Sequence, residues 1–234
     1  MAQVVGIDGC RGGWICAEVW IHKKSVRRIT LQIWHSFMQI IQAYRAAEAI
    51  AVDIPMGLWE EGRARLRPCD QAARLKLKGR ASTIFTPPTR SMLKAPAYEP
   101  LRSAGLSIQA YNLIPRIREV DDLITPSLQQ KIWESHPELS FTAMVGSPIP
   151  YSKHTKIGQS ERWKALEEKF GIKSLTEIRH LLGSNQFQRG FCLHDVLDAL
   201  ALAWSAQRRL QNSAEVCMGS PLYDAKGLMM AIWY

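Results

Sequence analysis

The first 34 residues constrain the fold most, because they predict three consecutive strands joined by short turns. Residues 3–8 form an apolar run, and a second apolar run over 14–21 follows the glycine-rich turn 9–13. Alternating apolar residues over 29–33 predict a third strand. Turns this short join antiparallel neighbours. We therefore expect the chain to begin as a three-stranded antiparallel meander.

Helical and strand patterns alternate after this meander. Ser36 is a candidate N-cap for a helix over 37–46, where apolar residues recur at helical spacing. Residues 49–55 predict a short buried strand that ends at a proline. Further helices are predicted over 69–77, 107–124, 161–170, 175–182 and 193–210, and further strands over 131–136 and 229–234. Pro115 is expected to kink or split its helix. The class is α/β, a mixed sheet flanked by helices.

Length and composition are those of an ordinary globular protein. The chain has 234 residues, 47% of them hydrophobic and 22% charged, which excludes a disordered, collagen-like or coiled-coil chain. This length supports a single domain over 1–234, with an irregular basic insertion at about 60–105. The sequence predicts no oligomeric state.

Three features favour a cytoplasmic protein that does not enter membranes. No run approaches the roughly 20 apolar residues that span a bilayer. The N-terminus enters an apolar strand pattern at once and lacks a basic leader. The five cysteines are scattered without a C-x-x-C pair, which is typical of free thiols in a reducing compartment.

Most of the net charge of +9 comes from one part of the chain. Residues 61–120 carry eight more cations than acids, and seven cations lie within 63–80. Such a density attracts polyanions and releases counterions on binding. It predicts nucleic acid or another phosphorylated ligand as the partner. The alternative is an ordinary solvated basic face.

Acidic residues stand at the ends of several predicted elements. Asp8 ends the first strand and Asp53 lies at the exit of the strand over 49–55. If these strands are neighbours in the sheet, both carboxylates lie at the same edge of it. Asp195 and Asp198 are three residues apart and share one face of the last long helix. Glu138 follows the strand over 131–136. The alternatives are turn or capping aspartates and a solvated helix flank.

Carboxylates that meet in this way need a cation. Close carboxylates repel one another and take up protons unless a divalent ion neutralises them. A site made of carboxylate oxygens favours Mg²⁺ or Mn²⁺ over zinc. The sequence therefore predicts that Asp8, Asp53, Asp195 and Asp198 hold Mg²⁺ or Mn²⁺.

Several motifs resemble one known family along nearly the whole chain. They occupy residues 6–14, 52–58, 67–70 with Arg74, 82–87, 117–121, 136–141, 152–153 and 195–199. On these motifs the chain is similar to domain-of-unknown-function family 429, a bacterial family described as predicted nucleases of the ribonuclease H-like fold. The resemblance implies metal-binding acids at Asp8, Asp53, Asp195 and Asp198, with Glu138 in a family-specific His-Pro-Glu motif. His194 departs from the acid expected there in many relatives.

The main hypothesis is a nuclease. Asp8, Asp53, Asp195 and Asp198 would hold two divalent ions about 3.5–4 Å apart for phosphodiester hydrolysis, with Glu138 as a further catalytic acid. The predicted substrate-binding cations are Arg11, Lys153, Arg67, Arg74 and Arg80, each of which has an ordinary surface-charge alternative. The competing functions are a non-catalytic nucleic-acid-binding or interaction protein and, less compatible with the length, an actin-like or sugar-kinase ATPase.

Overall fold

The chain opens with the three antiparallel strands that its sequence predicts. They are β1 (Ala2–Cys10), β2 (Gly13–His22) and β3 (Ser25–Trp34). β1 pairs with β2 and β2 pairs with β3, both antiparallel. This is seen in a computed structural model that describes residues 1–23, 25–171, 177–178, 180 and 190–234.

Two parallel strands extend this meander into a mixed sheet. β4 (Ala49–Val52) pairs parallel to β1, and β5 (Ile132–Glu134) pairs parallel to β4. The order in the sheet is β3-β2-β1-β4-β5. The predicted α/β class with a mixed sheet is confirmed. The expected strand over 229–234 is shorter than predicted, since only β7 (Ile232–Trp233) forms and pairs with β6 (Val216–Cys217) in a separate small sheet.

Helices connect and cover the strands. They are α1 (Phe37–Ala43), α2 (Pro68–Lys76), α3 (Tyr98–Ser103), α4 (Ile108–Leu123), α5 (Pro126–Gln129), α6 (Pro137–Val145), α7 (Lys156–Phe170) and α9 (Leu193–Leu210), with short 3₁₀ turns η1 (Ala81–Thr83) and η2 (Arg90–Lys94). Ser36 caps α1 as expected, accepting the Gln39 N–H. The helix predicted over 175–182 falls largely outside the described residues. No helix in the described part of the chain has the length and apolar character to cross a membrane.

Pro115 does not split its helix. α4 runs as one helix through this residue, although the proline ring removes a backbone donor. Ile114 and Ile117 on either side are fully buried in the core, so burial of this helix face outweighs the missing hydrogen bond.

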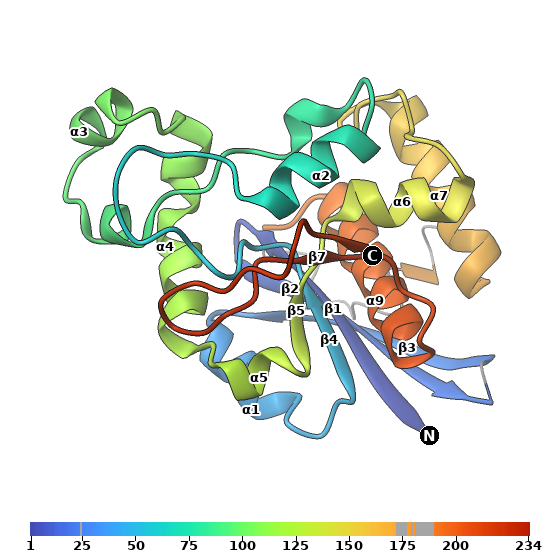
Figure 1. Cartoon of the computed structure of the whole chain (residues 1–234). Coiled ribbons are helices and arrows are strands. Elements are labelled where there is room, and N and C mark those ends of the chain that lie inside the picture. Colours follow the sequence, from blue (N-terminus) through green and yellow to red (C-terminus); the bar gives the residue numbers. More distant parts are fainter. Residues whose placement is uncertain (24, 172–176, 179, 181–189) are drawn as a thin grey trace.

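The helices lie on both faces of the sheet (Figure 1). α9 packs on one face, together with residues of α6 and α7, and α1 and α4 pack on the other. Each face of the sheet therefore has its own apolar core, as expected for parallel strands that are covered on both sides.

Gly6 sets how closely α9 approaches β1. A Cβ atom at Gly6 would lie 2.1 Å from the Ala199 carbonyl oxygen and 2.1 Å from the Ala203 nitrogen. Only glycine fits this contact between strand and helix backbones. The contact brings the first turns of α9 to the carboxyl end of β1.

Candidate active site

Two aspartates lie side by side at the carboxyl ends of β1 and β4. The parallel pair Ile7 and Val52 directly precedes Asp8 and Asp53, and the Asp53 N–H donates to the Ile7 carbonyl at 3.0 Å. Side chains alternate along a strand. Because Val4, Ala49 and Ala51 belong to the core that includes α9, Asp8 and Asp53 leave the sheet on the α9 face.

The start of α9 adds two more aspartates. Asp195 lies in the first turn, where one oxygen accepts the Cys192 N–H at 2.8 Å. Asp198 follows one turn later and is 1% exposed. Its Oδ2 atom lies 2.5 Å from the Lys153 ammonium nitrogen, whereas its buried Oδ1 atom has no hydrogen-bond partner among the residues that the structure describes.

The aspartates are close enough to shift one another's protonation. Burial, together with the negative charges of Asp198 and Asp53, raises the pKa of Asp8 well above its ordinary value. Burial raises the pKa of Asp53 as well. Burial raises the pKa of Asp198 to about 6, against the opposing effect of Lys153. Asp8, Asp53 and Asp198 therefore hold protons more strongly than free aspartates do, and Lys153 opposes this effect at all three.

Glu138 lies at the start of α6, and its carboxylate is paired with an arginine. Arg162 of α7 is fully buried and its Nη2 atom donates to both Glu138 oxygens, at 2.5 and 2.7 Å. Arg80 adds a longer contact at 3.3 Å. The His136 Nδ1 atom accepts the Glu138 N–H at 3.3 Å and so caps the helix. Arg162 thus holds both carboxylate oxygens of Glu138, so this side chain is poorly placed for the catalytic role that the sequence predicts.

These side chains share one cavity of about 420 Å³. The sequence-predicted residues that line it are Asp8, Asp53, Arg80, Glu138, Lys153, Asp195 and Asp198. We call this cavity the acidic cleft. Arg116 of α4 also lines it and donates to the Cys10 carbonyl. The sequence gives no signal for Arg116, because only the packing of α4 against the end of β1 places it there.

Three predicted substrate-binding arginines do not line the acidic cleft. Arg11 is exposed, next to Gly190. Arg74 donates twice to the Ile84 carbonyl, which fixes the chain after η1. The prediction for Arg67 is wrong, because this side chain is 1% exposed and its guanidinium pairs with buried Asp70 and Glu134. Arg67 joins the basic insertion to β5 and is not available to a substrate.

The donor set fits a hard divalent cation. Asp8, Asp53, Asp195 and Asp198 offer only carboxylate oxygens, the ligands that Mg²⁺ and Mn²⁺ prefer. The unpartnered Asp198 Oδ1 is a buried acceptor that a cation would satisfy. No three of these four carboxylates bring oxygen atoms within 4.8 Å of one another in the described part of the chain. Among the described side chains, the one trio of possible ligand atoms within 4.8 Å of one another is that of Cys192, His194 and Asp195.

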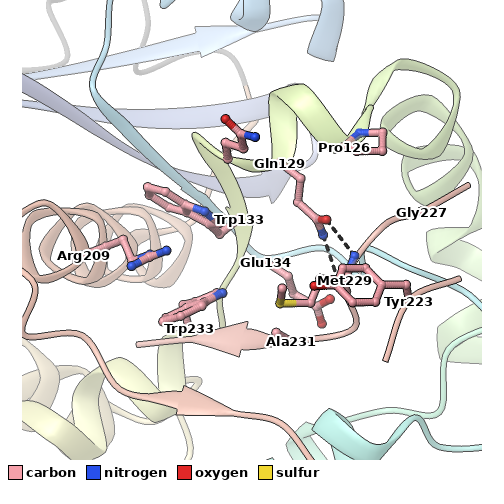
Figure 2. Close-up of a pocket in the computed structure, with 11 residues that line it drawn as sticks. Pro126, Gln129, Trp133, Glu134, Arg209, Tyr223, Gly227, Met229, Ala231 and Trp233 are labelled. Carbon is pink, nitrogen blue, oxygen red and sulfur yellow. Dashed lines mark hydrogen bonds between the residues drawn. The ribbon is translucent and has the colours of Figure 1, made fainter. Parts of the chain in front are cut away.

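A second cavity of about 340 Å³ lies beside β5 and the C-terminal segment. Figure 2 shows the Arg209 guanidinium between the indoles of Trp133 and Trp233, whose ring centroids lie 5.2 and 4.0 Å away. Gln129 donates to and accepts from the Met229 backbone. None of the sequence-predicted site residues lines this cavity. The sequence-predicted aspartates therefore belong to the acidic cleft and not to this second cavity.

The strand order defines the class of fold. A three-stranded antiparallel meander followed by parallel β4 and β5 is the arrangement of the ribonuclease H-like fold. The family model described as "Protein of unknown function (DUF429)" matches residues 6–222. The chain therefore belongs to this family, and the resemblance seen in its motifs is confirmed.

Two solved structures of RuvC from Thermus thermophilus are similar to the chain. One is titled "Thermus thermophilus RuvC structure" and the other is the same protein in complex with a Holliday junction substrate. Each is 13% identical with a TM-score of 0.36, and they cover 90% and 91% of this chain and 97% and 98% of their own. Nothing about activity follows from similarity at this level. No curated protein matches the sequence significantly.

Proposed function

We propose that this protein hydrolyses phosphodiester bonds in nucleic acid, with Mg²⁺ or Mn²⁺ held by Asp8, Asp53, Asp195 and Asp198. One observation supports the proposal most. Among the described residues, the buried Oδ1 atom of Asp198 has no hydrogen-bond partner, and it lies in the same cleft as Asp8. Burial and neighbouring negative charges raise the pKa of Asp8. Buried carboxylates gathered in this way destabilise the fold unless a cation compensates them.

Each element would contribute a defined part of the chemistry. Divalent ions, when bound, would neutralise the phosphate, lower the pKa of the attacking water and stabilise the leaving oxygen. Asp8 and Asp53 are fixed by the sheet, and Asp195 and Asp198 are fixed by the helix that packs on it. These rigid supports hold the carboxylates before substrate arrives.

Three cations in the cleft are suited to the substrate's phosphates. Lys153, Arg80 and Arg116 line the same cavity as the aspartates. Arg80 and Arg116 can position backbone phosphates through guanidinium hydrogen bonds, which carry no sequence information. Glu138 takes a positioning role in this proposal, because Arg162 holds both of its oxygens.

A cleavage assay tests the proposal. The purified protein is incubated with Mn²⁺ and single-stranded, double-stranded, hybrid and branched nucleic acids, next to Asp8→Asn and the control Asp122→Asn, which changes an exposed aspartate of α4. We expect wild type and the control to cleave at least one substrate, and Asp8→Asn to lose at least about 100-fold in rate. Equal cleavage by Asp8→Asn would assign the activity to another site.

A non-catalytic nucleic-acid-binding protein is the second candidate. The Lys153 ammonium favours it, because it already neutralises Asp198 without a metal ion. This function predicts that the wild type binds nucleic acid and cleaves no member of the panel. A filter-binding measurement on the same samples therefore separates the two functions.

A further inference from the structure

Cys192, His194 and Asp195 form a cluster of mixed donors at the edge of the acidic cleft. Their thiol, imidazole and carboxylate ligand atoms lie within 4.8 Å of one another. Cys192 is exposed, so an ion can reach its sulfur from solvent. His194 is half-buried and Asp195 is buried at the start of α9, where the helix fixes their spacing.

The spacing suits a tetrahedral ion. Zinc lies about 2.0–2.3 Å from sulfur, nitrogen and oxygen ligands, so ligand atoms around one zinc ion stand roughly 3.3–3.8 Å apart. His194 Nε2 already lies 3.2 Å from Asp195 Oδ1. The remaining pairs of ligand atoms, all within 4.8 Å of one another, need to approach by no more than roughly 1.3 Å.

The donor chemistry separates this cluster from the four aspartates. A cysteine sulfur and an imidazole nitrogen select zinc and similar thiophilic ions, whereas carboxylates alone favour Mg²⁺ and Mn²⁺. A second imidazole, that of His154, packs edge-on against His194 with ring centroids 4.7 Å apart.

We infer that Cys192, His194 and Asp195 bind a thiophilic divalent ion, with zinc as the expected one, in a three-ligand site whose fourth position stays open. Structural zinc sites are closed by four protein ligands, whereas three protein ligands with an open position are typical of catalytic zinc sites. The fourth position is therefore left to water or to an atom of a bound ligand.

Asp195 belongs to this cluster and also lines the acidic cleft. Its negative charge is one of those that raise the pKa of Asp8. Zinc on Cys192 and His194 would neutralise the Asp195 carboxylate and withdraw it from ions bound by the other aspartates. Zinc therefore acts as an inhibitor of the Mn²⁺-dependent activity, a consequence that rests on the proposed function.

Cobalt provides a test that does not depend on activity. Co²⁺ is titrated into the reduced full-length protein, and absorption is followed for the thiolate-to-cobalt charge-transfer band. We expect the band in wild type and in Asp8→Asn, its loss in Cys192→Ser, and its displacement by Zn²⁺. Zinc affinity measured by calorimetry should fall more than about 100-fold in Cys192→Ser and in His194→Gln.

Two results would overturn the inference. One is the absence of a charge-transfer band in wild type, and the other is a band of equal strength in Cys192→Ser, which would assign it to a different cysteine. Circular dichroism verifies that the variants fold. Zinc inhibition of cleavage, relieved by Cys192→Ser, then tests the coupling through Asp195. If the protein cleaves nothing, the cobalt spectra still decide whether the metal site exists.

Discussion

The ammonium nitrogen of Lys153 lies 2.5 Å from Oδ2 of Asp198, in the cleft where Asp8 and Asp53 also meet. Against the effect of burial, Asp198 and, to a smaller extent, Asp8 and Asp53 raise the pKa of Lys153. Lys153 thus supplies positive charge at the place where the proposed function requires a divalent cation. It is an internal competitor for that cation.

Replacing Lys153 should therefore strengthen metal binding. Lys153→Met removes the competing charge, and we expect Mn²⁺ affinity at neutral or alkaline pH to rise by about 10-fold, which is about 1.4 kcal/mol. Isothermal titration calorimetry measures this directly. Lys156→Met, at the exposed start of α7, is the matched control and should bind as wild type does. Unchanged or weaker binding by Lys153→Met would show that the lysine does not occupy the cation position.

Asp8 should destabilise the metal-free protein in a pH-dependent way. Since its folded-state pKa is raised, the folded protein keeps a proton that the unfolded chain has already released. The stability that comes from this proton is complete at pH values below the pKa of Asp8 in the unfolded chain. It is lost as the pH rises through the pKa of Asp8 in the folded protein. Asp198, with a folded pKa of about 6, acts in the same sense.

Asp8→Asn cannot ionise at this position. With a chelator present to remove metal ions, we expect the unfolding free energy of Asp8→Asn to exceed that of wild type by about 1–2 kcal/mol near pH 8, and by less near pH 5. Urea unfolding at the two pH values measures the difference. Asp122→Asn should show no such trend. A pH-independent difference, or a less stable Asp8→Asn near pH 8, would contradict the charge coupling in the cleft.

Arg80 should act on nucleic acid through phosphate. Arg80→Met is expected to weaken binding by a similar factor on all sequences and to reduce the slope of log K against log salt by about 1. Fluorescence anisotropy at several salt concentrations measures the slope. Arg102→Met, an exposed cation of α3 outside the acidic cleft, is the control. A slope equal to that of wild type would remove Arg80 from the binding surface.

Arg67 should matter for folding and not for substrate. Its guanidinium lies 2.6 Å from Asp70 and 2.5 Å from Glu134, and all three side chains are buried. Removing one partner leaves buried charge without compensation, so Arg67→Met should lower the unfolding free energy by about 3–5 kcal/mol. Arg63→Met, an exposed cation nearby in sequence, should have little effect. Equal stability of the two variants would contradict a structural role for Arg67.

The contact between β1 and α9 should tolerate no side chain at Gly6. Gly6→Ala places a Cβ atom against the α9 backbone, and we expect a loss of at least about 3 kcal/mol in unfolding free energy. Gly9→Ala in the same strand meets only the flexible side chain of Arg116 and should cost less. Chemical denaturation compares them. A mild effect at Gly6 would mean that α9 can move away from the sheet.

The sequence predicted those parts of the fold that local patterns determine. The strands of the meander, the Ser36 cap and the bounds of α9 follow from periodicity and capping, and the structure has them, whereas the predicted strand over 229–234 is reduced to β7. The position of Asp53 beside Asp8 follows from parallel pairing at one sheet edge. These features depend on neighbours in sequence or on a single pairing rule.

Features that depend on tertiary packing were not predictable in this way. The basic segment suggested that Arg67 is a surface cation, because charge patterning does not show which cations are buried with acids. Arg162 reaches Glu138, and Arg116 reaches the acidic cleft, only through the packing of α7 and α4. The cluster of Cys192, His194 and Asp195 is local in sequence, but it depends on the side-chain directions that the first turn of α9 sets.

Anomalous diffraction from a crystal soaked in Mn²⁺ tests the central claim most directly, because it locates the ion without reference to substrate. We expect an anomalous peak within coordinating distance of Asp8 and Asp198, with the Lys153 ammonium displaced from Asp198 Oδ2. An acidic cleft without a peak, in which the Lys153 and Asp198 ion pair stays intact at saturating Mn²⁺, would contradict the account.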